Sequence, residues 1–279
     1  MPELPEVEIT RRKLLPLLRG RRILDFWTNW VRGLRIAKSK EQIVKSIRGR
    51  KILDVARRGK VLVFRLSGEP ERMLAIHLRM SGRLEVVPLL SSWSSSPKWV
   101  HFRWRLSGGK ELRFVDPRKF GIVWYGAPEK LNRDPYLARL GLEADAMTFG
   151  QFSEVLADAR GMIKPFLLRQ DKFAGIGNII ADEALWRARI HPETRITYLD
   201  ARVRRRLYQG IRKTIRAMLS SGGTTLRNWR TPDGSAGRFQ EKRLVHGRAG
   251  QPCPRCRTIL KRIVVGGRGT TVCPRCQPR

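Results

Sequence analysis

The four cysteines constrain the folding of this chain more than any other feature. They form two Cys-Pro-Arg-Cys pairs with sixteen residues between them, near the end of the sequence: Cys253, Cys256, Cys273 and Cys276. The intervening segment has a strand-like run at 259–265, a Gly-Gly-Arg-Gly turn at 266–269 and a second short run at 270–272. Two Cys-x-x-Cys knuckles at the ends of a hairpin can close a tetrahedral thiolate cage around zinc.

One structural Zn²⁺ is expected in this cage. Four thiolates leave no open coordination position for chemistry, and iron in the same cage is the main alternative. A hairpin of about 25 residues cannot build a hydrophobic core of its own, so the metal would replace one. Metal ligands rather than disulfides fit a reducing compartment. The start of the chain does not read as a signal peptide, and no apolar run approaches the roughly 20 residues that span a bilayer. We therefore expect a cytoplasmic protein with no membrane contact.

The charge of the chain points to a polyanionic partner. Lys and Arg number 58 against 24 Asp and Glu, which gives a formal net charge of +34. A solvated surface, or the Arg-rich usage of a high-GC genome, would be the plainer explanation. However, the basic residues alternate with apolar ones, as at 11–15 and 203–207, so the charge sits on folded elements rather than on a disordered tail.

Hydrophobic periodicity changes once along the chain. Residues 2–19 read as a helix with acids at its start, although Pro16 should kink or end it. Short β-branched and aromatic runs between 21 and 125 predict an antiparallel sandwich or barrel. Beyond about 135 the apolar residues recur every three or four positions, which predicts helices, and residues 222–240 read as a long loop.

A series of motifs resembles one known family. The motifs, in chain order, are Met-Pro-Glu-Leu-Pro-Glu-Val-Glu at the start, Arg58-Gly59-Lys60, His77-Leu78-Arg79-Met80-Ser81-Gly82, Asp116-Pro117-Arg118-Lys119-Phe120-Gly121, Gly175-Ile176-Gly177-Asn178-Ile179, Gly222-Gly223-Thr224-Thr225 and the four-cysteine module. Together they resemble bacterial formamidopyrimidine-DNA glycosylase over essentially the whole chain. Pro-Glu-Leu-Pro-Glu favours this branch over endonuclease VIII, which usually begins Pro-Glu-Gly-Pro-Glu.

The resemblance implies an α+β multidomain fold. An N-terminal antiparallel β-sandwich with flanking helices would carry the nucleophile, and a helical helix-two-turns-helix domain and a zinc-finger hairpin would follow, with DNA in the cleft between them. The domains expected on this basis are a catalytic domain at 1–134, a DNA-binding helical domain at 135–240 and a zinc-finger hairpin at 241–279.

The first two residues of the mature chain would carry the chemistry. An unprotonated α-amino group, with a pKa of about 7.7–8.0, is a better nucleophile at neutral pH than an unperturbed lysine. Pro2, once Met1 is removed, would attack the sugar C1′ and give a cationic iminium that promotes strand elimination. A proline near a helix start is common for structural reasons alone, and only the resemblance makes Pro2 catalytic. Glu3 resembles the family's general acid, and Glu6 is given a supporting role.

Two further residues are assigned to catalysis by the resemblance. Lys60, in the Arg-Arg-Gly-Lys turn, stands where the family has a second catalytic or phosphate-holding lysine, although a solvated lysine would be the default. Arg268, at the tip of the cysteine hairpin, matches the arginine associated with δ-elimination and phosphate contact.

DNA contacts follow from the same resemblance. A lesion inside a duplex must be flipped out before an enzyme can reach it. Met80, Arg118 and Phe120 match the residues that fill the resulting gap. The remaining DNA-binding residues are His77, Arg160 and Asn178, the last at a helix start where it would bind phosphate. The 222–240 loop would close over the extruded base.

Some positions depart from the family pattern. His246 stands where a phosphate-binding tyrosine is usual, and Lys98-Trp99-Val100 replaces a segment that commonly contains a DNA-contacting histidine. These changes put two phosphate contacts in doubt, and the high positive charge could compensate for them.

The expected function is a bifunctional DNA glycosylase and abasic-site lyase of base excision repair. It would remove 8-oxoguanine and formamidopyrimidines from double-stranded DNA, act on abasic sites and work as a monomer at the nucleoid. An endonuclease VIII-like enzyme for oxidised pyrimidines and a non-catalytic zinc-ribbon nucleic-acid-binding protein are the alternatives. The ranking of lesions and the preferred opposite base depend on loop geometry and do not follow from the sequence.

Overall fold

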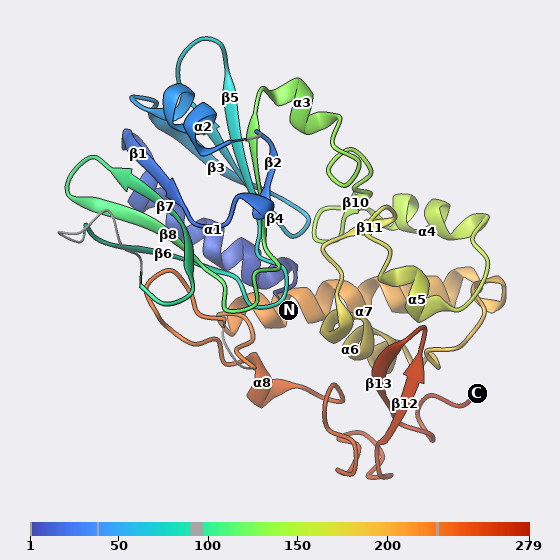
Figure 1. The fold of residues 1–279 in the computed structure, drawn as a ribbon. Coiled ribbons are helices and arrows are strands. Elements are labelled where there is room, and N and C mark those ends of the chain that lie inside the picture. Colours follow the sequence, from blue (N-terminus) through green and yellow to red (C-terminus); the bar gives the residue numbers. More distant parts are fainter. Residues whose placement is uncertain (1, 38, 90–96, 227–228) are drawn as a thin grey trace. The chain divides into compact units, whose positions relative to one another are not determined.

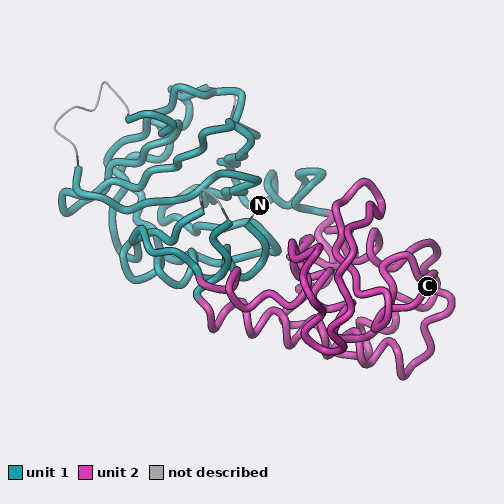
Figure 2. The backbone as a smooth tube through the Cα atoms, turned by 90° about the horizontal axis from the view of Figure 1, so that it is seen from below, with its two compact units in different colours: residues 1–138, 222–237 teal, residues 139–221, 238–279 magenta. Residues whose placement is uncertain are grey.

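The protein is represented by a computed structural model that describes residues 2–37, 39–89, 97–226 and 229–279. It consists of two compact units (Figure 2). Unit 1 comprises Met1–Ala138 and Gly222–Gly237, and unit 2 comprises Arg139–Ser221 and Arg238–Arg279. Most of the predicted 222–240 loop thus packs within unit 1, although the segments before and after it belong to unit 2. Met1, whose removal the predicted chemistry requires, lies outside the described residues.

Unit 1 is the predicted β-sandwich (Figure 1). One antiparallel sheet has the order β1 (Ile23–Thr28), β7 (Val100–Leu106), β8 (Lys110–Val115) and β6 (Arg83–Pro88). The other has the order β2 (Leu34–Ile36), β9 (Ile122–Gly126), β5 (Arg72–His77), β4 (Val61–Leu66) and β3 (Ile52–Arg58), with β2 and β9 parallel and the other neighbours antiparallel. Alternate residues of both sheets face one another in a single core that includes Phe26, Phe64, Phe102 and Phe114.

Helices close the ends and the outer face of the sandwich. Helix α1 (Leu4–Leu18), which the sequence predicted, contains Pro16 and ends two residues after it, so the missing backbone N–H falls near the end of the helix. Helix α2 (Lys40–Ile47), which the sequence did not predict, inserts Ile43 and Ile47 into the core. Helix α3 (Pro128–Asn132) covers the outer face of the second sheet through Leu131, and a 3-10 turn, η1 (Val31–Gly33), precedes β2.

Strand register brings two of the predicted site residues to the same end of neighbouring strands in the second sheet. Strands β3 and β4 are joined by the two-residue turn Gly59-Lys60, in which Gly59 has a φ of +56° that suits glycine. In the next strand pair, Val61 lies opposite His77. Lys60 and His77 therefore lie at the same end of neighbouring strands.

Two crossing helices form the centre of unit 2. The predicted helices are α6 (Asn178–Ala188) and α7 (Ala201–Ser220), and α7 buries Leu207, Ile211, Ile215 and Met218 in a stripe. A Cβ on Gly210 would lie 2.8 Å from the Ala184 carbonyl oxygen, so this glycine allows the two backbones to approach closely.

Shorter elements surround this pair. They are β10 (Leu142–Glu143), α4 (Phe149–Ala157), α5 (Ile163–Leu167), β11 (Phe173–Ala174), η2 (Ile196–Tyr198), α8 (Phe239–Lys242) and the antiparallel hairpin of β12 (Lys261–Val265) and β13 (Arg268–Val272). In the described parts of the chain, no helix combines the length and the apolar character needed to cross a membrane.

Candidate functional site

The start of α1 is a buried cluster of acidic residues next to Pro2. Pro2 is buried, and Glu3 and Glu6 are each 2% exposed. Glu3 is the N-cap of α1, and its backbone N–H donates to Glu6 Oε2 at 2.8 Å. The other oxygen of Glu6 accepts the backbone N–H of Thr224 at 2.8 Å. One carboxyl group thus joins the start of the chain to the Gly-Gly-Thr-Thr motif.

The environment of Glu6 favours its neutral form. Burial, followed by the nearby charge of Glu3, raises the pKa of Glu6 to about 7, while the two amide donors oppose this shift. Glu6 therefore exchanges a proton near neutral pH, beside the residue predicted to be the general acid. The sequence indicated only a supporting role for Glu6. Its contact with Thr224 joins residues 218 positions apart, and no local sequence pattern reveals such a contact.

Lys60 is not a solvated lysine. The side chain is 3% exposed although it lies in a hairpin turn, where lysine is normally hydrated. Its positive charge contributes to lowering the pKa of His77, which places the two groups in the same electrostatic environment. A solvated lysine, which would be the default interpretation of the sequence at this position, does not match this burial.

His77 is buried and has protein partners at both ring nitrogens. Its Nδ1 accepts the Arg79 backbone N–H at 2.9 Å, and its Nε2 lies 3.1 Å from the Tyr136 hydroxyl. Burial, then the charges of Arg79 and Lys60, lowers the pKa of His77 to about 3. His77 is thus neutral at physiological pH and holds the Leu78–Ser81 turn. Its predicted direct contact with DNA stays a prediction.

The three predicted gap-filling residues are exposed on two loops of unit 1. Met80 is 48% and Phe120 45% exposed, and the Arg118 guanidinium carbon lies 4.5 Å from the centroid of the Phe120 ring. Single exposed apolar side chains are common on protein surfaces, but neighbouring ones often mark a binding site. The exposure supports an interaction role for these residues over strand packing.

Asp116 joins these two loops. Its buried carboxylate accepts the backbone N–H groups of Phe120 and Gly121, each at 2.8 Å, and that of Arg118 at 3.2 Å. The Ser81 hydroxyl, on the loop that carries Met80, donates to the same carboxylate. Asp116 lies in the Asp-Pro-Arg-Lys-Phe-Gly motif, but sequence reasoning assigned it no role.

The predicted residues of unit 2 lie around the hairpin tip and the start of α6. Arg268 is exposed beside the Gly266-Gly267 turn. Asn178 Nδ2 donates to the Gly269 carbonyl at 2.9 Å, and its Oδ1 is buried without a hydrogen-bond partner among the described residues. Asn178 and Arg268 are thus held close together. Arg160 is exposed elsewhere in unit 2 and donates to the Ala159 carbonyl at 3.3 Å.

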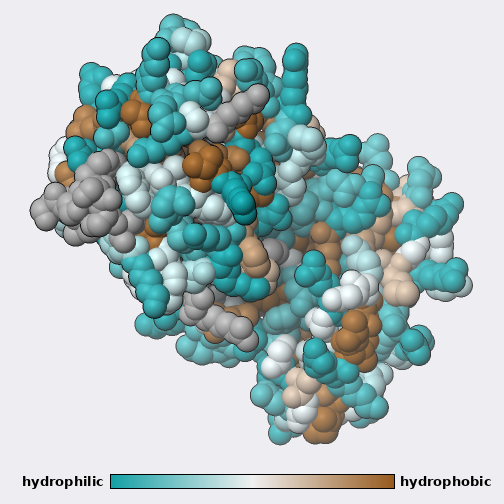
Figure 3. All heavy atoms as spheres, in the orientation of Figure 1, coloured by the Kyte–Doolittle hydropathy of each residue, from teal (hydrophilic) through white to brown (hydrophobic). Residues whose placement is uncertain are grey.

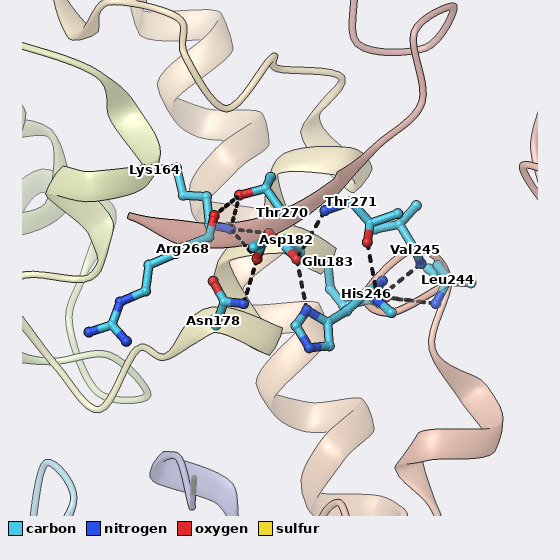
Figure 4. A network of polar contacts seen from close by, with 12 residues as sticks. Lys164, Asn178, Asp182, Glu183, Leu244, Val245, His246, Arg268, Thr270 and Thr271 are labelled. Carbon is cyan, nitrogen blue, oxygen red and sulfur yellow. Dashed lines mark hydrogen bonds and ion pairs between the residues drawn. The ribbon is translucent and has the colours of Figure 1, made fainter. Parts of the chain in front are cut away.

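A buried ion pair supports this arrangement (Figure 4). Lys164 Nζ lies 2.6 Å from both Asp182 Oδ1 and Thr270 Oγ1, and Lys164 and Asp182 are fully buried. The second oxygen of Asp182 lies 2.7 Å from Nδ1 of His246. This network ties α5, α6 and the His246 loop to β13.

Two departures from the family pattern are visible in the structure. His246, in the position of the usual tyrosine, is oriented by Asp182 and remains partly exposed. Trp99 is 47% exposed, with Lys98 Nζ 5.0 Å from its ring centroid.

The four cysteines fit one tetrahedral metal ion. Their sulphur atoms all lie within 4.8 Å of one another, with 3.9 Å between Cys253 and Cys276 and 3.4 Å between Cys256 and Cys273. Zn–S bonds of about 2.3 Å in a tetrahedron place sulphurs about 3.8 Å apart. The sulphurs are too far apart for disulfides, and the donor set is that of a structural zinc site.

Three family models match the chain. They describe the formamidopyrimidine-DNA glycosylase N-terminal domain at residues 1–123, the formamidopyrimidine-DNA glycosylase H2TH domain at 139–229 and the zinc finger found in FPG and IleRS at 250–279.

Curated relatives and solved structures agree with these models. Formamidopyrimidine-DNA glycosylase of Deinococcus radiodurans is 42% identical, covering 100% of this chain and 98% of the relative, and that of Bacillus subtilis is 35% identical, covering 96% and 95%. The MutM (FPG) protein of Thermus thermophilus has a TM-score of 0.86 and 38% identity, covering 99% and 98% of the two chains. A Lactococcus lactis FPG mutant in complex with Fapy-dG-containing DNA has a TM-score of 0.89 and 32% identity over the whole of both chains.

These features define a zinc-finger DNA repair glycosylase. They are the sandwich with its buried Pro2 and Glu3, the helical unit and the four-cysteine hairpin. The chain belongs to the formamidopyrimidine-DNA glycosylase family.

Proposed function

We propose that this protein excises oxidised purines from duplex DNA and cleaves the strand at the resulting abasic site, with Pro2 as the nucleophile. The observation that carries the proposal is the buried cluster at the start of α1, where Pro2 adjoins Glu3 and Glu6 and Glu6 binds the Thr224 backbone. The binding of Fapy-dG-containing DNA by the Lactococcus lactis relative supports the choice of lesion.

Each step can be assigned to residues of this chain. The Pro2 nitrogen forms a bond to C1′ as the bond from C1′ to the base breaks and the base leaves with a proton. Glu3 protonates the ring oxygen, the sugar opens and the secondary amine becomes an iminium. Glu3, now a carboxylate, takes the C2′ proton as the bond to the 3′ phosphate breaks. Hydrolysis of the iminium, or a second elimination that expels the 5′ phosphate followed by hydrolysis, then releases Pro2.

Buried groups near the nucleophile suit these proton transfers. Glu6, with a pKa near 7, can exchange the proton that Glu3 gives up or receives. Lys60, buried in its turn, would hold a phosphate or a leaving group close to the sugar. Met80, Arg118 and Phe120 would fill the space left by the extruded nucleotide, and Asp116 would keep their loops together.

The zinc ion would have no part in the chemistry. Cys253, Cys256, Cys273 and Cys276 would hold it, and it would supply rigidity to the hairpin. The Lys164–Asp182 pair and Asn178 would then position Arg268 toward a phosphate, where it assists the second elimination. The three predicted domains and a monomer working in the cytoplasm at the nucleoid are part of the same proposal.

A panel of lesion duplexes tests the substrate class. We expect release of 8-oxoguanine and formamidopyrimidine at least tenfold faster than release of an oxidised pyrimidine, and strand products with phosphate at both ends. The Arg268→Gln variant should bind lesion DNA more weakly and, at saturating protein concentration, release the base but accumulate the product of the first elimination alone. A Lactococcus lactis relative has been described with oxidised-pyrimidine-containing DNA. Activity on the pyrimidine lesion alone would therefore not decide between the two classes, whereas a preference for it over the purine lesions would favour the endonuclease VIII-like alternative.

A further inference from the structure

We infer that unit 1 has a second DNA-binding site, which holds the backbone of another duplex segment away from the catalytic residues. The site is an open pocket of about 730 Å³ between α2 and the β4–β5 connection. Its basic lining residues are Arg22, Lys45, Arg48, Arg50 and Arg72, and Glu69 is the acidic residue among the lining residues. None of the residues placed above in catalysis or lesion binding belongs to it.

The pocket is preorganised by backbone carbonyls. Arg50 Nε donates to Ser46 at 2.6 Å, and Arg50 Nη1 donates to Ser67 at 2.7 Å and to Gly68 at 3.0 Å. Arg22 Nη1 donates to Gly49 at 2.9 Å. Arginines that are already fixed lose less conformational entropy when they bind an anion. These bonds also hold the turns at both sides of the pocket.

The acidic groups nearby do not neutralise this charge. Arg48 is paired with Asp25 at 3.0 Å, yet 57% of its side chain remains exposed. Lys45 is exposed and belongs to the last turn of α2. The remaining cations face Glu69 alone among the residues that line the pocket. A net positive pocket of this kind favours phosphate.

The pocket lies at the opposite end of the strands of the second sheet from Lys60 and His77. Strand β3 runs from the Arg50 end to the Gly59-Lys60 turn in seven residues, about 23 Å at 3.3 Å per residue. Strand β5 likewise begins at Arg72 and ends at His77. Figure 1 shows α2 and the N-terminus at different ends of unit 1. A ligand in the pocket is therefore a second ligand.

The lining identifies the ligand as the backbone of a duplex. The lining residues include no aromatic side chain, so the pocket offers no surface on which an unpaired base or a nucleotide could stack. Arginine forks suit phosphodiester oxygens, which a duplex presents without opening.

Two neighbouring hollows adjoin the pocket, and each adds one further lysine. One shares Lys45 and Arg48 and adds Lys40, together with the acids Asp25 and Glu41 and the aromatic residues Phe26 and Trp27, and another shares Arg72 and adds Lys130 and Tyr125. Hydrophilic side chains cover much of the upper edge of unit 1 in Figure 3, where Figure 1 places α2. A track of cations fits successive phosphates better than a single small anion. A protein that holds a second DNA segment while its catalytic site is bound to the first could transfer directly from one segment to the other.

Two-colour anisotropy tests the inference with the full-length, zinc-loaded protein. The proposed catalytic site is first saturated with a labelled 13-base-pair duplex that contains an uncleavable abasic-site analogue. A lesion-free duplex with a second label is then titrated at several salt concentrations. We expect it to bind without displacing the first duplex. The Lys45→Ser/Arg48→Ser variant should bind the second duplex at least tenfold more weakly, with a salt slope lower by about 1.8, or 0.9 per lost phosphate contact.

A matched variant separates the pocket from overall charge. Arg19→Ser/Arg133→Ser removes two exposed positive charges that do not line the pocket, and should bind the second duplex within twofold of the wild type. All three proteins should release the lesion base at the same rate, which shows that they are folded. Absence of a second duplex on the wild type, equal losses in both variants, or complete displacement by inorganic phosphate at equal ionic strength would overturn the inference. Lesion excision is measured separately, so its failure would leave this result standing.

Discussion

Glu6 holds two backbone amides from distant parts of unit 1 on a single buried carboxyl group. A charged Glu6 would be a better acceptor for both amides, but burial and the neighbouring Glu3 oppose the charge and raise its pKa to about 7. The same group therefore links α1 to the Gly-Gly-Thr-Thr segment and changes its protonation near neutral pH.

Replacing Glu6 with glutamine should change how stability depends on pH. The pKa of Glu6 is about 7 in the folded protein against 4.5 as the reference value, so the folded state binds this proton more tightly. This contribution is complete below pH 4.5 and is lost as pH rises to 7. Relative to Glu6→Gln, the wild type should lose about 3 kcal/mol of unfolding free energy over this interval. Urea unfolding at a series of pH values measures it, and parallel curves for the two proteins would refute the assignment.

The crossing of α6 and α7 depends on a glycine at the contact. A Cβ at Gly210 would lie 2.8 Å from a backbone oxygen of α6, which cannot move aside as a side chain could. The same crossing fixes α6, whose first residue is Asn178 and whose Asp182 and Glu183 hold the His246 loop. Close packing of two helices thus orients a set of residues proposed to face DNA.

The Gly210→Ala substitution should destabilise the protein despite the higher helix propensity of alanine. Alanine gains about 1 kcal/mol in a helix interior, but overpacking costs about 1–3 kcal/mol, and an approach of 2.8 Å to a fixed backbone oxygen supports the upper end of that range. A net loss of up to about 2 kcal/mol is expected. Gly150→Ala in α4 is the control, because the nearest atom to its Cβ would be 3.8 Å away, and it should leave stability unchanged or increase it. Thermal unfolding compares the two, and equal effects would contradict the close approach.

Sequence patterns predicted the elements better than their contacts. The strands of the sandwich, α6, α7 and the cysteine hairpin each have a local period or spacing that identifies them. The pattern did not reveal the burial of Lys60, the acceptor role of Asp116 or the Lys164–Asp182 pair. These features arise from contacts between residues far apart in the chain or from the packing around a turn, and no local period records them.

At the scale of the whole molecule, unit 1 and the hairpin of unit 2 are stabilised in different ways. Unit 1 has a large aromatic and aliphatic core, whereas the hairpin of unit 2 has a small cluster around the cysteines, with Trp186, Val245 and Leu260. Four mutually close thiol groups without metal would be a poor substitute for a core. Metal binding and folding of the hairpin are therefore expected to be coupled.

Removing the metal should inactivate the hairpin and leave unit 1 folded. The purified protein should contain one zinc per chain by elemental analysis, and a strong chelator should release it with loss of lesion-DNA binding by at least tenfold, because Arg268 and Asn178 lose their common support. The near-ultraviolet circular dichroism of the sandwich aromatics should persist. Full DNA affinity in the zinc-free protein would show that the hairpin folds without metal.

The most direct measurement of the proposed chemistry is borohydride trapping on a lesion-containing duplex. Only an iminium between protein and sugar is reduced to a stable covalent adduct. We predict that the wild type forms this adduct through Pro2, as located by mass spectrometry, while a protein that retains Met1 forms none and Pro2→Gly forms much less. Trapping through an internal lysine, or normal excision and strand cleavage by the protein that retains Met1, would contradict the assignment of the nucleophile.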